Sequence, residues 1–149
     1  MIIRPIKQSD YNAWLPLWDG YNAFYGREGE MALAPSITQT TWQRFFDANE
    51  PMFALVAEID GQLVGLAHYL FHRRMITVES ICYLSDVFTL PTKRKTGIGR
   101  ALIEAVYAAA LAAGSKRVYW QTHESNSSGR SLYNKVAKHS GYIVYASDL

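Results

Sequence analysis

Apolar residues follow two different spacings in the N-terminal third of the chain. Residues 2–6 are a short run rich in isoleucine, which favours a strand. Aromatic and leucine side chains between Trp14 and Tyr21 then recur at helical spacing, and Ser9–Asp10 offers a cap for that helix. Pro16 falls inside the pattern and predicts a kink or a later start of the helix.

The next segments predict a second short helix and a hairpin. Apolar spacing favours a helix over residues 38–46, with its aromatic side chains buried. Residues 52–59 and 62–71 are strand-like runs separated by Asp60-Gly61. An Asp-Gly pair between two such runs is the strongest short-range signal for a β-hairpin, so two antiparallel strands are predicted.

The second half of the chain alternates strands with helices. Residues 79–90 predict a strand that Pro91 ends, and apolar residues at helical spacing predict a helix from Ile98 to its C-cap, Gly114. A strand follows over residues 117–122.

The chain ends with one more predicted helix and strand. Residues 126–128 cap a helix that Gly141 ends, and Tyr142–Tyr145 is a last strand. The whole order predicts an α/β (α+β) fold, with a mixed central sheet of about six strands flanked by about four helices. No repeat, linker or low-complexity segment divides the chain, so residues 1–149 are expected to form one domain.

Composition narrows the class of protein. Hydrophobic residues make up 49% and charged residues 19%, as in an ordered globular chain. The net charge of +2 is too small for a general nucleic-acid binder. Cys82 is the single cysteine, and the N-terminus lacks a signal-peptide pattern, so a cytoplasmic location is expected. No apolar run reaches the roughly 20 residues needed to span a bilayer.

The positive charge gathers in a glycine-bearing loop between a predicted strand and a predicted helix. Lys93–Lys95 precede Gly97 and Gly99, and Arg100 follows. Free N–H groups at a helix N-terminus, glycines and basic side chains together favour phosphate. The loop lacks the Walker pattern, and Leu102 stands where a dinucleotide fingerprint needs a third glycine.

Two motifs resemble those of one enzyme family. Residues 94–99, Arg-x-x-Gly-x-Gly, match the Arg/Gln-x-x-Gly-x-Gly/Ala pyrophosphate loop of GNAT acetyltransferases. Residues 126–135, Asn-x-x-Gly-x-x-Leu-Tyr-x-Lys, are similar to the family's Asn-x-x-Ala-x-x-Leu-Tyr-x-Lys, with Gly129 in place of alanine. The resemblance implies the GNAT fold and an acetyl-CoA-dependent N-acetyltransferase.

Residues 82–88, Cys-Tyr-Leu-Ser-Asp-Val-Phe, resemble one branch of this family. That branch holds the spermidine/spermine and histone-acetyltransferase-like small amine acetyltransferases. Its members carry an acidic pair where this chain has Ser85-Asp86, so half of the pair is missing. The implied partner is a small-molecule amine such as a polyamine or an amino acid. A homodimer is also expected, through the edge of the last strand.

The resemblance implies binding roles on three segments and a substrate pocket. The resemblance assigns pantetheine to Val87, Phe88 and Thr89. It assigns the pyrophosphate to Arg94, Lys95, Thr96, Gly97, Ile98, Gly99 and Arg100. The far side of the cofactor is assigned to Asn126, Ser128, Gly129 and Tyr133. Substrate contacts are expected from Tyr21, Phe24, Tyr25, Ser85, Asp86 and Gln121. An aromatic wall suits a cation, although these aromatic residues could equally be core.

Catalysis needs a proton acceptor and a proton donor. An alkylammonium must lose a proton before it attacks a thioester. Asp86 is the first candidate base, with Glu79 second, although Asp86 could equally bind the cationic amine or pair with a structural cation. Tyr133 stands at the family's general-acid position. Family geometry also implies an oxyanion-binding N–H near Phe88, where the strand bulges.

Other reactive side chains have simpler explanations. Cys82 in a strand is expected to be a small buried hydrophobe rather than an acyl-carrying nucleophile. His68 and His72 lie about 13 Å apart if both are on one strand, so no metal site is predicted.

The predicted function is direct transfer of acetyl from acetyl-CoA to a small amine. The first alternative is acetylation of a protein lysine or N-terminus, which would need an open peptide groove. The second is a non-catalytic regulatory domain that binds acyl-CoA, and the presence of Tyr133 and Asp86 argues against it.

Overall fold

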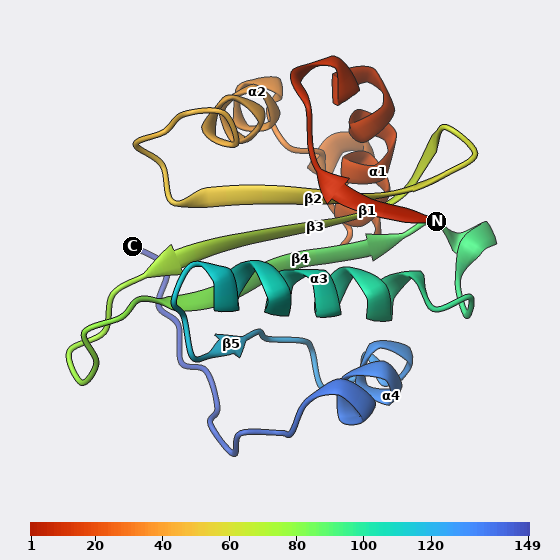
Figure 1. The fold of residues 1–149 in the computed structure, drawn as a ribbon. Helices are drawn as coiled ribbons and strands as arrows, with labels where there is room; N and C mark the ends of the chain where they lie inside the picture. Colours follow the sequence, from red (N-terminus) through yellow and green to blue (C-terminus); the bar gives the residue numbers. More distant parts are fainter.

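The sheet at the centre of the molecule has its strands in chain order (Figure 1). In the computed structural model, which describes residues 1–149, β1 pairs with β2, β2 with β3 and β3 with β4 in antiparallel fashion, and β4 with β5 in parallel. The strands are β1 (Ile2–Pro5), β2 (Met52–Ile59), β3 (Gln62–His72), β4 (Ile81–Thr89) and β5 (Val118–Tyr119).

Helices cover both faces of this sheet (Figure 1). Helices α1 (Tyr11–Phe24) and α2 (Pro35–Arg44) lie on one face, and α3 (Ile98–Ala112) and α4 (Ser127–Val136) lie on the other. Short 3-10 turns occupy Gln8–Asp10, Gly29–Met31 and Pro91–Lys93. The predicted α/β fold with four helices is therefore confirmed, with five strands rather than six.

Strand β3 builds both halves of the core because its neighbours cover both faces. Leu66 packs under α1 with Trp14, whereas Ala67 and Tyr69 pack under α3. Successive side chains of a strand point to opposite faces, so a strand buried on both sides is apolar almost throughout. The β2–β3 hairpin is confirmed, and Asp60 and Gly61 both have positive φ (50° and 76°), as a type I′ turn requires.

The predicted last strand is absent. Residues 137–149 form no helix or strand, α4 ends at Val136 rather than near Gly141, and Tyr142–Tyr145 are exposed. A β-branched and aromatic run becomes a strand only beside a neighbour with free hydrogen-bonding groups, and β5 spans only Val118–Tyr119. The predicted dimer through a last-strand edge therefore loses its structural basis in this chain.

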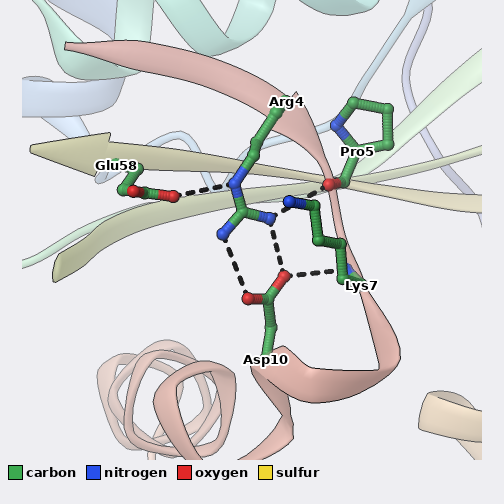
Figure 2. Close-up of polar contacts among 5 residues, drawn as sticks. All are labelled: Arg4, Pro5, Lys7, Asp10 and Glu58. Atoms are coloured by element: carbon green, nitrogen blue, oxygen red, sulfur yellow. Dashed lines mark hydrogen bonds and ion pairs between the residues drawn. The ribbon is translucent and has the colours of Figure 1, made fainter. Parts of the chain in front are cut away.

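Helix α1 begins after an ionic junction that ties it to the sheet (Figure 2). Arg4 of β1 donates to both carboxylate oxygens of Asp10, at 2.7 and 3.0 Å, and to Glu58 of β2 at 2.8 Å. The Asp10 carboxylate also accepts the Lys7 N–H at 2.7 Å. The predicted cap at Ser9–Asp10 thus caps the turn that precedes α1 rather than α1 itself.

Asp10→Asn is expected to lower the free energy of unfolding at neutral pH by about 1–2 kcal/mol, because it breaks a bidentate charged contact. The hydrogen bond from Arg4 lowers the pKa of Asp10, so its contribution is present at neutral pH and is lost as pH falls below about 4. Urea unfolding of the wild type and Asp10→Asn, at neutral pH and below about pH 4, measures the difference in the free energy of unfolding. Asp19→Asn, an exposed carboxylate of α1 without an ion-pair partner, is the control; equal losses for both variants would contradict the prediction.

No helix of the structure is both long and apolar enough to cross a membrane.

Candidate active site

The site is organised by a bulge in β4. Asp86 pairs with His68 of β3, but the next β3 residue, Tyr69, pairs with Leu84, which leaves Ser85 without a partner. The extra residue changes the face to which the strand directs its side chains. Leu84 packs into the core under α3, whereas Asp86 contacts α1 on the other face.

The bulge lies before the predicted position near Phe88. From Asp86 to Thr89 the β3–β4 ladder runs without a register shift. The other edge of β4 pairs with β5 only at Cys82 and Tyr83, so Leu84 to Thr89 have no strand partner there. The backbone groups that this stretch directs to that edge therefore have no strand partner and suit an extended ligand, although the Thr89 carbonyl also accepts a hydrogen bond from Arg94.

Asp86 is a largely buried carboxylate with donors beside it. Its side chain is 15% exposed; it accepts hydrogen bonds from His68 Nδ1 at 2.9 Å and Ser85 Oγ at 3.2 Å, and the Tyr21 hydroxyl lies close to it. Burial alone would raise the pKa of Asp86, but these contacts outweigh it and hold the pKa below its usual value. Asp86 is thus anionic at neutral pH, which suits binding of a cation better than acceptance of a proton.

Aromatic side chains at the end of α1 stand beside this carboxylate. The rings of Tyr21 and Tyr25 lie 5.1 Å apart, and those of Phe24 and Tyr25 also 5.1 Å apart. Phe24 and Tyr25 are exposed, so they are not core residues, whereas Tyr21 also stacks on Trp18. Burial and the neighbouring Asp86 raise the pKa of Tyr21, which keeps its hydroxyl protonated.

Arg27 is a cation of the site that sequence reasoning missed. Its guanidinium carbon lies 5.7 Å from the Tyr21 ring centroid and 5.2 Å from that of Tyr25. Its Nε donates to Oδ1 of the buried Asn22 at 2.7 Å, and Asn22 in turn donates to the Trp18 carbonyl at 2.9 Å. Arg27 forms no salt bridge, so its terminal nitrogens are available to an anion. A cation directly after an aromatic cluster was the available sequence signal.

Tyr133 belongs to α4 and lies in the same region. Its ring packs edge-on against Trp120, with centroids 5.5 Å apart. Burial, with a smaller effect of Tyr25, raises the pKa of Tyr133, so its phenol stays protonated at neutral pH. Asp86 and Tyr133 therefore offer opposite chemistry, an anion and a neutral proton donor.

The glycine-bearing loop has the predicted form of an anion site. The first helical bond of α3 runs from the Ala101 N–H to the Gly97 carbonyl, so the preceding N–H groups of the helix have no intrahelical acceptor. Lys95 and Gly97 have positive φ (62° and 88°), which turns the chain into the helix. The Thr96 hydroxyl fixes the turn through the Lys93 carbonyl at 2.6 Å.

The basic side chains of the loop differ in their partners. Arg94 donates to the Thr89 carbonyl at 3.3 Å, and its guanidinium lies over the rings of Phe24 and Phe88, at 6.0 and 5.9 Å. Arg100 instead pairs with Glu104, one turn further along α3, at 2.8 Å. Arg94 thus connects the glycine-bearing loop to the aromatic side chains of Phe24 and Phe88.

The second motif is built around a helix cap. The Asn126 side chain accepts the Gly129 N–H at 3.1 Å and donates to the Thr122 hydroxyl at 3.0 Å. A Cβ at Gly129 would lie 2.5 Å from Asn126 Nδ2, so an alanine here would require the Asn126 side chain to shift. Ser128 and Gln121 are exposed and make no side-chain hydrogen bond within the chain, so their predicted binding roles stay predictions.

Two other candidates lie away from this region. Glu79 precedes β4 and pairs with Lys116 at 2.8 Å, so the structure does not place it beside Asp86 as a second base. Cys82 is fully buried under α3, on the face opposite Asp86, and burial raises the pKa of its thiol to about 11. It is the small buried hydrophobe that was predicted.

His68 is a second residue whose contacts at the site were not predicted from the sequence, since it was weighed only as a metal ligand with His72. His68 contacts Asp86 and the Trp14 indole nitrogen, whereas His72 contacts the Tyr119 hydroxyl at 2.8 Å. No cluster of three His, Cys, Asp or Glu side chains in the chain could hold a metal ion.

Comparison with known proteins identifies the family. Residues 14–137 match the acetyltransferase (GNAT) family. The chain is 33% identical over 147 residues to the D-amino-acid N-acetyltransferase HPA3 of Saccharomyces cerevisiae, covering 97% of this chain and 89% of the relative.

Solved structures share the fold at low sequence identity. The ribosomal-protein-alanine N-acetyltransferase from Brucella melitensis superposes with a TM-score of 0.80 at 19% identity, with full coverage of both chains. AAC(6')-Iy, bound to the bisubstrate analogue CoA-S-monomethyl-acetylneamine, gives a TM-score of 0.84 at 16% identity, covering 99% of this chain and 97% of that one. With the glycine loop, the β4 bulge and the matched family, the chain belongs to the GNAT family of N-acetyltransferases.

Proposed function

We propose that this enzyme transfers the acetyl group of acetyl-CoA to the α-amino group of a free amino acid. The observation that carries this proposal is that two opposite charges lie beside Tyr21. The Asp86 carboxylate is close to the Tyr21 hydroxyl, and the Arg27 guanidinium lies 5.7 Å from the centroid of the same ring. An α-amino acid carries an ammonium group and a carboxylate on one carbon, so it complements both charges.

The residues around the glycine loop fit the acyl donor. The free N–H groups at the start of α3 and the positive φ of Gly97 suit a pyrophosphate, and Lys95 adds charge. The unpaired edge of β4 suits the amide groups of pantetheine, which hydrogen-bond as a strand does. Acetyl-CoA supplies the activated acetyl group when it is bound.

Asp86 and Tyr133 have different roles in the proposed reaction. Asp86 holds the ammonium group, which loses its extra proton to water before the nitrogen attacks. The nitrogen attacks the thioester carbonyl and forms the new carbon–nitrogen bond; it then loses a second proton to solvent as the carbon–sulfur bond breaks and the amide forms. Tyr133 gives its phenolic proton to the departing sulfur and recovers a proton from solvent.

The relatives agree with an amino-acid substrate. The relative at 33% identity is named as a D-amino-acid N-acetyltransferase. A polyamine carries only positive charge and would be repelled by Arg27, and the site has Ser85 where the polyamine branch has a second carboxylate. Acetylation of a protein N-terminus remains the second candidate, since the Brucella enzyme that shares the fold acts on a ribosomal protein.

A matched panel of acceptors tests this substrate class. Initial rates of CoA release are measured with D- and L-amino acids, the corresponding amino-acid amides, a polyamine, an aminoglycoside and a peptide with a free N-terminus. The expected result is a higher kcat/KM for amino acids than for their amides, which lack the carboxylate. A preference for amides, polyamine or peptide would contradict the substrate class while leaving acetyl transfer intact.

Arg27→Gln is expected to raise KM for the amino acid by about tenfold or more, because it removes a charged contact with the carboxylate. The same variant is expected to change the rate with the amino-acid amide by no more than about twofold. Arg44→Gln, which alters an exposed arginine of α2 away from the site, is the control. An equal effect on acid and amide would show that Arg27 acts only through the fold.

A further inference from the structure

We propose that His68 is a positioning residue that fixes Asp86, and that Trp14 keeps Nε2 of His68 unprotonated. The inference rests on the proposed function, because Asp86 is taken as the group that holds the substrate ammonium. It goes beyond that function by assigning a task to two buried residues that contact neither substrate nor acetyl-CoA in the proposal.

Both nitrogens of the His68 ring are engaged. His68 is 3% exposed and lies directly opposite Asp86 at the bulge. Its Nδ1 lies 2.9 Å from Asp86 Oδ2, and its Nε2 lies 3.0 Å from the indole nitrogen of Trp14. Trp14, His68 and Asp86 thus form one line of hydrogen-bonded side chains, which runs from the core under α1 to the site.

The chemistry of the three groups fixes the position of the proton. The Trp14 indole N–H is only a donor, so His68 Nε2 must accept and carries no proton. The single ring proton is then on Nδ1 and is donated to Asp86. A doubly protonated His68 ring would direct its Nε2–H at the indole N–H of Trp14. The ring is therefore a neutral imidazole beside the ionised carboxylate of Asp86.

The surrounding packing keeps this line in place. Trp14 is fully buried and stacks on Trp18, with ring centroids 5.7 Å apart. The Phe45 ring lies 4.7 Å from the His68 ring, centroid to centroid, and covers its side. His68 and Ser85 contact different oxygens of Asp86, so the plane of the carboxylate is fixed. A fixed carboxylate orients the bound amine toward the acyl group, and small errors in such an orientation are costly.

Two substitutions of His68 separate its two contacts. The amide nitrogen of asparagine can occupy the place of Nδ1 and keep the donation to Asp86, whereas it loses the contact with Trp14. The longer glutamine side chain can occupy the place of Nε2 and keep the contact with Trp14, whereas it loses Asp86. Both variants cost packing, so thermal unfolding is measured for each.

His68→Gln is expected to lower kcat/KM for the amine by about 10- to 100-fold while leaving KM for acetyl-CoA unchanged. His68→Asn is expected to lower it by no more than about threefold, whatever its loss of thermal stability. His72→Asn and His72→Gln, on the same strand outside the site, serve as matched controls. Equal losses for both His68 variants, or losses that follow the melting temperatures, would overturn the inference.

A second measurement does not depend on turnover. Long-range ¹H–¹⁵N spectra of the imidazole rings report the tautomer of each histidine. We expect His68 in the neutral Nδ1–H form in the wild type, and a ring that takes up a second proton on Nε2 more readily, as the pH is lowered, in Trp14→Phe. A protonated Nε2 in the wild type would overturn the inference. Absence of wild-type turnover on any amine would instead refute the proposed function, and the spectra would still report whether Trp14 keeps Nε2 unprotonated.

Discussion

Asp86→Asn is expected to lower kcat/KM for the amine by about 10²- to 10³-fold while leaving the affinity for acetyl-CoA unchanged. The substitution keeps the shape of the side chain and removes its charge, so a buried ammonium group loses its only paired carboxylate at the site. Initial rates over a matrix of both substrate concentrations give kcat/KM, and titration with acetyl-CoA gives the affinity.

The control for this variant is Glu79→Gln. Glu79 is a carboxylate just before the same strand that pairs with Lys116 and lies outside the site, so its variant is expected to keep full activity. An Asp86→Asn enzyme with at least half of the wild-type kcat/KM would show that Asp86 does not hold the amine.

The pH dependence distinguishes an anchor from a base. Despite burial, the hydrogen bond from His68 holds the pKa of Asp86 below its usual value, so the carboxylate is ionised throughout the neutral range and loses its charge only in acid. The rise of kcat/KM with pH should therefore follow deprotonation of the amine and keep its midpoint in Asp86→Asn. A midpoint near pH 7 that disappears in Asp86→Asn would show that Asp86 is the catalytic base instead.

Tyr133→Phe is expected to lower kcat by about 100-fold with little change in either KM, because it removes the proton donor to the departing sulfur. Burial raises the pKa of Tyr133, so the wild-type phenol stays protonated throughout the neutral range. Initial rates with both substrates varied measure this difference.

Tyr107→Phe provides the matched control for the loss of a hydroxyl. Tyr107 belongs to α3 and donates to the Val136 carbonyl at 3.0 Å, so its variant tests stability without touching the site. We expect it to keep wild-type kcat. Equal kcat in the wild type and Tyr133→Phe would show that the thiolate departs without help from this phenol.

Local signals predicted much of the fold. The Asp60-Gly61 pair specified the hairpin because two positive φ values are needed within a two-residue turn. The loop before α3 was predictable because Gly97 and the basic residues lie next to each other in the sequence. The prediction of a last strand was wrong because Tyr142–Tyr145 has strand propensity but no neighbouring strand to pair with.

The parts of the site that were missed depend on contacts between distant residues. The bulge was predicted near Phe88 and lies at Ser85, because its position follows from how β4 pairs with β3, which no local pattern in β4 reveals. His68 meets Trp14 across 54 positions of sequence, so its role could not be predicted from its own surroundings. Arg27 differs from these two, because the buried Asn22 that holds it lies only five residues earlier and the contact is local.

The central claim is that this enzyme acetylates the α-amino group of a free amino acid. The most direct test is to incubate the purified chain with acetyl-CoA and a D- or L-amino acid, and to identify the acceptor product by mass spectrometry while CoA release is followed. The account predicts N-acetylated amino acid in equal amount to the CoA released, with Tyr133→Phe much slower. Bound acetyl-CoA without any acetylated amino acid, or acetyl retained on Cys82, would contradict it.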